Sequence, residues 1–177
     1  MIPVPAFNPA KDGITHINVY SNGRTKLGQK LSHFDHAPWV TADGLFDCFE
    51  GWWFWQLVDS TGSQMALFGT PDREPLRIMT GLQAKEYGTA IVGKKKDWPA
   101  DVTLGSFKAK YVSAAKAKLL QYPDLANLLK SSTLPLVHYY VIPVRQGSPI
   151  TKSDPRGDWI MKVWEDFRFQ LQNGQPL

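Results

Sequence analysis

Apolar residues recur at intervals of three and four along several stretches of the chain, which is the spacing of one face of an α-helix. Helices are predicted over residues 107–121 and 123–129 from this spacing, and over residues 75–81 and 82–87 from their end signals, with Pro75 suited to a first helical position. Gly88 is expected to close the helix over residues 82–87 from the C′ position. A last helix begins at Asp158, which is predicted to cap it. Its expected buried face consists of Trp159, Val163, Phe167 and Leu171.

Alternating apolar and polar positions predict short strands between these helices. Strands are expected near residues 15–20 and 134–142, and a hairpin over residues 40–46 is expected to turn at Asp43-Gly44. Strands near both ends of the chain, with helices around them, indicate an α+β fold. We therefore expect a small, mainly antiparallel sheet, drawn from residues near 15–46 and 134–142 and surrounded by helices.

A stretch rich in tryptophan, residues 46–57, carries a carboxylate on an apolar helix face. Glu50, Trp53 and Leu57 lie at i, i+3 and i+7, so they share one side of the helix predicted to run to about residue 59. Asp47 is the predicted N-cap, and Glu50 stands three residues later, as the acidic partner does in a capping box. The helix dipole favours an ionised carboxylate in the first turn, whereas burial against aromatic rings disfavours it.

This pattern leaves two interpretations of Glu50 open. It is either a helix-capping residue among ordinary core tryptophans, or the catalytic acid of a pocket walled by aromatic side chains. A charge on so apolar a face costs free energy unless a partner or a ligand matches it. The residues around Glu50 must therefore decide between the two.

Composition limits the classes of protein that fit. The chain has 177 residues, 43% hydrophobic and 20% charged. That fits one domain over residues 15–177, preceded by a proline-rich extended arm over residues 1–14. The net charge of +4 and a pI near 9.1 are compatible with a polyanionic or phosphate-bearing ligand. Cys48 is the only cysteine, so an intramolecular disulfide is impossible and a reducing compartment is inferred.

The start of the chain has no basic, apolar leader, and no apolar run is long enough to cross a bilayer. We therefore expect a cytoplasmic protein that does not act at a membrane. Glycine-rich phosphate loops and the Gly-x-Ser-x-Gly elbow are absent from the sequence. His33 and His36 have no obvious third ligand, so no metal site is predicted. Cys48 lacks a local histidine partner and is expected to be a buried structural thiol.

Several short segments follow one another in an order that matches a known family. They are Ile17-Asn18-Val19-Tyr20-Ser21, Leu31-Ser32-His33-Phe34, Asp43-Gly44, Phe49-Glu50-Gly51-Trp52-Trp53-Phe54, the run Lys118, Gln121, Pro123, Leu125, Leu128, Leu129, and Leu136-Val137-His138. As an ordered set they resemble the NADAR family (named for NAD and ADP-ribose), which contains the YbiA-like proteins. The family's counterparts are Ile-Asn-Phe-Tyr-Ser, Phe-Ser-Asn-Phe, Asp-Gly…Ser-Glu-His-Tyr-Phe, Lys-Phe-x-Gln…Leu…Leu-Leu and Leu-Val-Glu. The resemblance covers roughly residues 15–172.

The chain also departs from the family pattern. His33 stands where the second motif has Asn, and His138 where Glu follows Leu-Val. Residues 141–147 replace the family's Trp-Gly-x-Gly loop, and Pro155-Arg156-Gly157-Asp158 stands where the family has Gly-Lys-Asn-Arg. Such departures are similar to those of a divergent branch that includes bacteriophage-encoded members.

The resemblance implies a metal-independent N-glycosyl hydrolase, without a cofactor, that removes ADP-ribose from a modified nucleobase, guanine foremost, in DNA or RNA. Glu50 is the implied catalytic residue, because a carboxylate beside the ribose can stabilise positive charge at C1′ or activate water. The side chains expected to contact the ligand are Ser21, Arg24, Ser32, His33, Phe34, Trp53, Lys85, Lys118, His138, Tyr140 and Asp158.

The chemistry of each part of the ligand suggests which of these side chains would bind it. The diphosphate needs cations, for which the candidates are Lys85, Lys118, Arg24 and Arg156. A flat base needs an aromatic face, for which the candidates are Trp53, Trp39 and Tyr140. The expected partners are ADP-ribose and ADP-ribosylated nucleic acid, with no obligate protein partner. In a phage, the activity would reverse the work of a host toxin that ADP-ribosylates viral DNA.

Two other functions remain open. The replaced Asn and the missing Trp-Gly loop are compatible with a non-catalytic sensor of ADP-ribose or a nucleotide. The same glycosidase chemistry could instead act on a small metabolite, such as an aminated ribosyl-pyrimidine phosphate of riboflavin biosynthesis.

Overall fold

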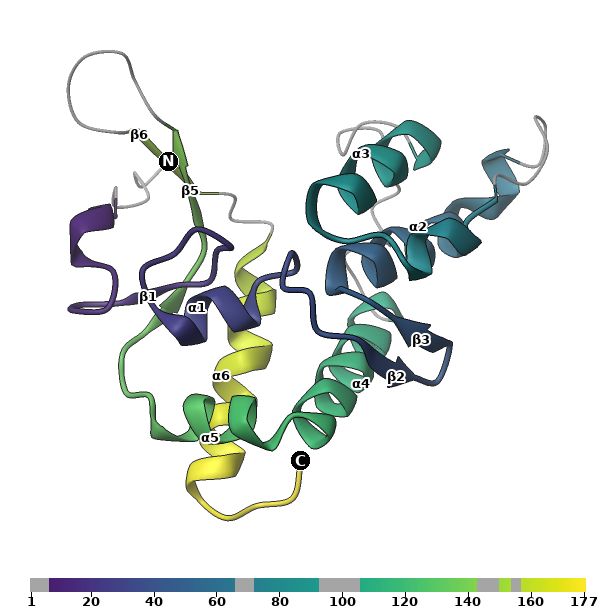
Figure 1. Ribbon diagram of the computed structural model, residues 1–177. Coiled ribbons are helices and arrows are strands. Elements are labelled where there is room, and N and C mark those ends of the chain that lie inside the picture. Colours follow the sequence, from purple (N-terminus) through teal and green to yellow (C-terminus); the bar gives the residue numbers. More distant parts are fainter. Residues whose placement is uncertain (1–6, 66–71, 93–105, 143–149, 154–156) are drawn as a thin grey trace. The chain divides into compact units, whose positions relative to one another are not determined.

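The computed structural model describes residues 7–65, 72–92, 106–142, 150–153 and 157–177, and side chains are described in these ranges except at 59–65 (Figure 1). Within these ranges six α-helices and six short strands make the chain an α+β protein. It forms two compact units. Unit 1 contains residues 1–32 and 123–177, and unit 2 contains residues 33–122.

The strands do not form the single sheet that the sequence predicts. In the described residues they form three separate two-stranded pairs: β1 with β4, β2 with β3, and β5 with β6. The last two pairs are antiparallel, but the β1–β4 pair is parallel. Each of these strands is two to four residues long, at or below the short end of the usual range.

Unit 1 is organised around β1, Ile17–Asn18, which pairs with β4, Leu136–Val137. The Asn18 side chain extends this pairing, because its amide donates to the Tyr139 carbonyl and its oxygen accepts the Tyr139 N–H, both at 3.1 Å. Helix α1, Lys26–Leu31, is capped by Thr25 and approaches β1 closely at Gly28. A Cβ at Gly28 would overlap the Asn18 carbonyl oxygen, so this approach requires glycine.

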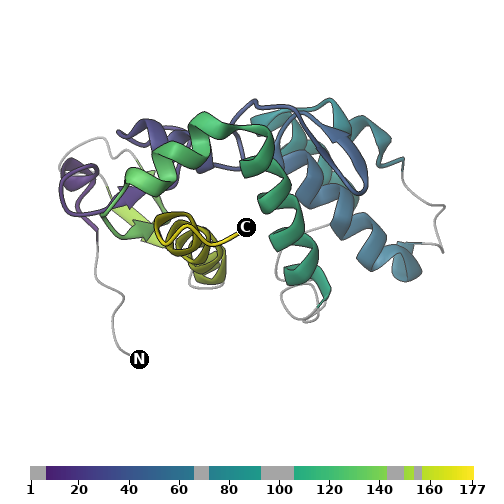
Figure 2. The same ribbon diagram turned by 90° about the horizontal axis from the view of Figure 1, so that it is seen from below.

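Two longer helices complete unit 1. Helix α5, Pro123–Ser131, packs against helix α6, Asp158–Gln172, as both views show (Figure 1; Figure 2). The antiparallel ribbon of β5, Tyr139–Ile142, and β6, Ile150–Ser153, belongs to the same unit. The fully buried residues of α6 are Met161, Trp164 and Phe167. The buried face of α6 is therefore rotated from the predicted one. Phe167 is buried as expected, but Trp159, Val163 and Leu171 are only half-buried.

The described part of the N-terminal segment is not the extended arm that its prolines suggest. Phe7 stacks on Tyr139 with ring centroids 5.4 Å apart. Pro9–Lys11 form a short 3₁₀ helix, η1. The buried Asp12 carboxylate accepts the backbone N–H groups of Asn18 and Arg24. These contacts tie residues 7–14 to unit 1, because a buried carboxylate is stable only where N–H groups satisfy it.

Unit 2 is organised around helix α2, Phe49–Met65, in which every residue from Gly51 to Val58 is buried. Around it lie the hairpin of β2, Trp39–Thr41, and β3, Gly44–Phe46, the 3₁₀ helix η3, Glu74–Arg77, and the helices α3, Gly81–Val92, and α4, Ser106–Gln121. Figure 1 shows α3 beside α2. The buried Gln56 is satisfied within this packing, since it donates to Asp43 and accepts from Lys110.

Two glycines allow the neighbours of α2 to come this close. A Cβ at Gly51 would overlap the carbonyl oxygen of Leu76 in η3, and a Cβ at Gly88 would overlap the Phe54 ring. Gly88 lies inside α3, which continues to Val92. The prediction that Gly88 ends this helix is therefore wrong: the residue is glycine because two helices meet there, not because the backbone turns.

We expect Gly88→Ala to lower the free energy of unfolding by about 1–3 kcal/mol, because the added methyl group forces α3 away from Phe54. Helix propensity alone would change it in the opposite direction, by about 1 kcal/mol. The sign measured by urea unfolding therefore separates the two effects. Thr89→Ala, at the next and exposed position, is the matched control and should not destabilise the protein.

His16 should make unit 1 sensitive to acid. Its ring is buried and bonded to the Tyr139 hydroxyl at 2.8 Å, and burial lowers its pKa from the ordinary value of 6.5. The unfolded chain therefore takes up a proton near pH 6.5 that the folded chain resists, so stability falls as the pH falls through that value. Urea unfolding at pH 7.5 and 5.5 should show this loss in the wild type and a smaller loss in His16→Gln. Equal losses in both proteins would contradict the prediction, and His36→Gln, which changes an exposed histidine, controls for the substitution itself.

Candidate functional site

Glu50 lies in the first turn of α2, but not in the capping box that the sequence predicts. The Asp47 N–H donates to the Arg77 carbonyl at 2.8 Å, so the reciprocal capping bond does not form. Cys48 takes the capping role instead, because its sulfur accepts the Gly51 N–H at 3.4 Å. The backbone N–H of Glu50 donates to the His33 carbonyl at 3.0 Å. This bond fixes the start of α2 beside His33.

The Glu50 carboxylate begins a chain of three polar side chains. Its Oε2 lies 3.4 Å from Nδ1 of His33, and Nε2 of His33 lies 3.2 Å from the Tyr111 hydroxyl. A carboxylate can only accept hydrogen bonds, so the neutral imidazole is best arranged with its proton on Nδ1 and Nε2 accepting from Tyr111. The Glu50 and His33 side chains are only 12% and 18% exposed, and Tyr111 is fully buried. The chain therefore runs from the core of unit 2 to two side chains that are partly exposed to solvent.

Aromatic rings surround this chain. The His33 ring stacks on Phe49 and tilts against Trp53, each with centroids 5.4 Å apart. Trp53, which is 9% exposed, packs edge-on against Phe107 at 4.7 Å. Such walls exclude water and strengthen the electrostatic effect of Glu50 on a charge next to it. Chemically, the site can stabilise a developing cation or take a proton from a water molecule.

Cys48 is the buried thiol that the sequence predicts. Burial raises the pKa of the Cys48 thiol, and its S–H donates to the Met79 carbonyl at 3.3 Å. The group is therefore a protonated, bonded part of the α2 terminus. This arrangement does not suit a nucleophile, which must be an exposed thiolate.

Unit 2 also brings Phe34 and Lys85 together. The Lys85 ammonium lies 5.7 Å from the centroid of the Phe34 ring, and both side chains are half-buried. Cation–π attraction holds the ammonium near this ring. Of the cations predicted to bind the diphosphate, Lys85 is the one in unit 2 whose position fits that role.

Lys118 does not fit it. Its side chain is 1% exposed, and its ammonium lies 3.5 Å from Asp35 and over the rings of Phe49 and Trp39, at 5.4 and 5.8 Å from their centroids. Trp39 is itself fully buried, and its indole N–H donates to the Ala114 carbonyl at 3.1 Å. Both residues belong to the core of unit 2, so the expected phosphate contact of Lys118 and the expected base contact of Trp39 do not fit their burial.

The remaining predicted residues belong to unit 1. Arg24 is exposed, and its guanidinium donates to the Ala10 carbonyl at 3.2 Å. Ser21 lies in the turn after β1 and is half-buried. Ser32 ends α1 and is buried, with its N–H donating to the Gln29 carbonyl at 3.2 Å. Arg156, a further candidate cation, lies outside the described residues.

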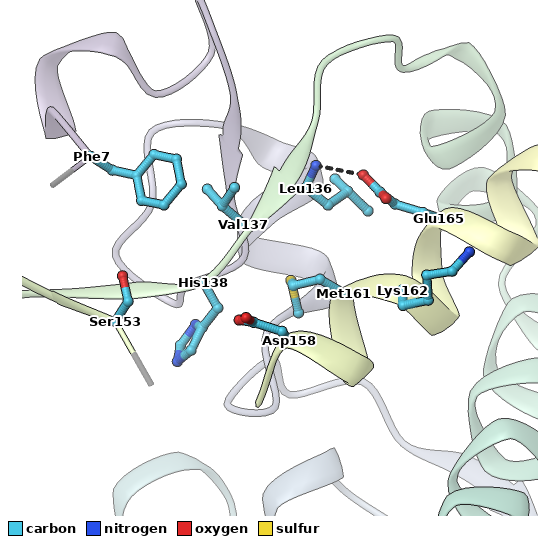
Figure 3. Close-up of a pocket in the computed structure, with 9 residues that line it drawn as sticks. All are labelled: Phe7, Leu136, Val137, His138, Ser153, Asp158, Met161, Lys162 and Glu165. Atoms are coloured by element: carbon cyan, nitrogen blue, oxygen red, sulfur yellow. Dashed lines mark hydrogen bonds between the residues drawn. The ribbon is translucent and has the colours of Figure 1, made fainter. Parts of the chain in front are cut away.

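His138, Tyr140 and Asp158 lie around the ribbon and α6. Nδ1 of His138 lies 2.7 Å from the Val19 carbonyl oxygen, which can only accept, so this nitrogen carries the proton. The Tyr140 ring meets those of His138 and Tyr20 edge-on, at 4.8 and 6.0 Å. Asp158 is the first residue of α6, and Gly157 is the N-cap, which corrects the predicted cap. Asp158 and His138 both line a cavity of about 300 Å³ (Figure 3).

The predicted site residues thus form two sets, one in each unit. His33, Glu50 and Trp53 are in mutual contact or linked through His33 in unit 2, beside the Phe34–Lys85 pair. Sequence reasoning missed Tyr111 and Phe49 as members of the Glu50 site. Phe49 stood out only as part of the segment that resembles the family, and Tyr111 only as part of the helix predicted over residues 107–121. No local pattern indicates that a tyrosine hydroxyl in α4 reaches His33.

The part of the chain that the structure describes contains no group of three or more His, Cys, Asp or Glu side chains able to hold a metal ion. In the same ranges, no helix has both the length and the apolar character needed to cross a membrane. No protein-family model, curated protein or solved structure matches the chain.

If Lys118 is structural, its loss should be costly. Lys118→Met removes the cation of a buried ion pair and leaves the Asp35 carboxylate without that counter-charge. We therefore expect the free energy of unfolding to fall by about 3–5 kcal/mol. Asp35→Asn on the same background should recover part of this loss. Lys116→Met, at a half-buried position of the same helix, is the control and should change stability by less than about 1 kcal/mol. Equal effects of Lys116→Met and Lys118→Met would contradict a structural role.

Proposed function

We propose that the protein is a metal-independent N-glycosyl hydrolase that removes ADP-ribose from an ADP-ribosylated nucleobase, guanine foremost, in DNA or RNA. The observation that carries this proposal is the Glu50 carboxylate, 12% exposed and 3.4 Å from His33, whose ring lies against Phe49 and Trp53. The ordered motifs that resemble the NADAR family, and the basic balance of the chain, support the same substrate class.

The reaction breaks the bond between ribose C1′ and a nitrogen of the base. The bonding electrons leave with the base nitrogen, and positive charge develops at C1′. Glu50, placed beside C1′, stabilises that charge and takes a proton from the attacking water as its oxygen bonds to C1′. The base recovers a proton from solvent, so the products are ADP-ribose and the unmodified base.

His33 and Tyr111 act in this scheme as positioning residues. The Tyr111 hydroxyl donates to Nε2 of His33, and Nδ1–H of His33 points towards Glu50. This arrangement of the three side chains holds the carboxylate in one orientation. Lys85, fixed over Phe34, is the cation of unit 2 that we assign to the diphosphate. Trp53 is the aromatic face that we assign to the base or the adenine.

One feature of the site favours a second candidate function, a non-catalytic sensor of ADP-ribose. His33 stands beside the carboxylate, at the position where the NADAR pattern has Asn. A Glu50 carboxylate held by His33 could accept hydrogen bonds from a ribose without promoting cleavage. The two functions differ in one measurable respect, which is whether the glycosidic bond breaks.

The deciding experiment is single-turnover release of ADP-ribose from a guanine-modified DNA oligonucleotide, with a chelator present. We expect wild-type protein to release ADP-ribose, and Glu50→Gln to do so more slowly by a factor on the order of a hundred to ten thousand, while it still binds ADP-ribose. Glu86→Gln, an exposed position of α3, is the matched control and should match the wild type.

Other outcomes would point elsewhere. If the wild type binds free ADP-ribose but never cleaves it from the oligonucleotide, and Glu50→Gln binds equally well, the sensor function replaces the hydrolase function. If free nucleotides compete fully and the length of the oligonucleotide has no effect, the substrate is a small ribosyl metabolite rather than nucleic acid.

A further inference from the structure

The cavity of about 300 Å³ in unit 1 joins an apolar wall to a set of polar groups (Figure 3). Its apolar lining comes from Phe7, Leu136, Val137 and Met161. Its polar lining comes from His138, Ser153, Asp158, Lys162 and Glu165. An apolar cavity of this size with a few convergent polar groups is the usual form of a site for a small molecule.

The charges around this cavity are unequal. Figure 3 shows the Asp158 carboxylate directed towards His138 and the Lys162 ammonium pointing away from Asp158. That ammonium is paired with Asp166 at 2.6 Å, and Asp166 does not line the cavity. The positive charge of Lys162 is therefore balanced by a residue outside the cavity. Of the two lining carboxylates, Glu165 is likewise matched by Arg168 at 3.2 Å, so Asp158 contributes most of the net negative charge among the described lining residues.

Glu165 is held in place by the fold. Its Oε1 accepts the backbone N–H of Leu136 at 3.1 Å and a guanidinium N–H of Arg168 at 3.2 Å. The first of these bonds joins α6 to β4 at one end of the cavity, and the second lies within α6. Asp158, at the other end, is exposed and lies in the first turn of α6. Asp158 is thus the carboxylate best placed to receive a charged group, with Ser153 as a further hydrogen-bond acceptor.

We propose that this cavity binds a small organic cation, a protonated amine, amidine or guanidine carried on a compact apolar body. The cationic head would donate charge-assisted hydrogen bonds to Asp158, and the body would pack against Val137 and Met161. The Asp158 carboxylate disfavours a phosphate or another carboxylate. The site concerns unit 1 alone, so it does not depend on the hydrolase function proposed for Glu50.

Three probes of nearly equal size and shape test the charge requirement: benzamidine, benzamide and benzoate, which are cationic, neutral and anionic. Each is titrated into the full-length, isotope-labelled protein while backbone amide shifts are recorded. We expect benzamidine to give saturable shifts at Val137, His138 and Ser153, benzamide to bind more weakly, and benzoate to give none. Benzoate binding as tight as that of benzamidine, or saturable shifts confined to other residues, would overturn the proposal.

Two substitutions test the role assigned to Asp158. Asp158→Asn should weaken benzamidine binding roughly tenfold and leave benzamide binding unchanged, because only the charged probe uses the carboxylate. Asp124→Asn, which removes an exposed acid from the first turn of α5, should change neither. Equal effects of the two substitutions on benzamidine would mean that overall charge, not this cavity, attracts the probe, and the proposal would fail.

A cavity-filling variant tests the location independently. Ser153→Leu places a larger side chain in the lining and should abolish saturable binding of both benzamidine and benzamide. Ser153 is half-buried in β6, and the amide spectrum of the free variant reports directly whether unit 1 remains folded. Unchanged benzamidine binding in a folded Ser153→Leu protein would place the probe elsewhere and overturn the proposal.

Discussion

Close backbone contact around α2 is the constraint on which unit 2 depends. A helix that is buried on every side from Gly51 to Val58 cannot use one polar face to reach water, so its neighbours must enclose it completely. Glycines at positions 51 and 88 permit this, because η3 and α3 come within a distance that a Cβ would prevent. The enclosure fixes the axial and rotational position of α2. The first turn, with Glu50, is therefore held in place by the packing of residues 51–58 as well as by the Cys48 cap and the bond to His33.

The His33–Glu50 pair and the Lys118–Asp35 ion pair lie in the aromatic core of this unit, and one ring contacts both. Phe49 stacks on His33, the partner of Glu50, and lies 5.4 Å from the ammonium of Lys118, the partner of Asp35. Electrostatic interactions are stronger where water is excluded, and unmatched charges are correspondingly costly. The Lys118–Asp35 pair is deep and serves stability. The His33–Glu50 pair lies nearer the surface, where a ligand could exchange places with water.

Much of this arrangement follows from sequence patterns, and the exceptions have identifiable causes. The α+β class, helix α4 and the hairpin before α2 were predictable, because periodicity and turn residues act locally. Helix α1 was missed, since its six residues are too few to show a period. The parallel β1–β4 pair and the Tyr111–His33 contact join segments far apart in the chain, which no local pattern encodes. Gly88 was misassigned because glycine has the same appearance in sequence whether it ends a helix or admits a neighbour. The NADAR resemblance and the role of Glu50 stay predictions.

The division of unit 1 between the two ends of the chain has a consequence for how the protein is made. Its central contacts join residues such as Val19 and His138, which are 119 positions apart. On the ribosome, residues 33–122 can emerge completely and collapse around α2 while β1 still lacks its partner strand. Unit 1 must wait until β4 and then α6 have left the exit tunnel. Its buried Asp12, His16 and Asn18 remain in water until then, and this polar cluster keeps the unfinished N-terminal segment hydrated during synthesis.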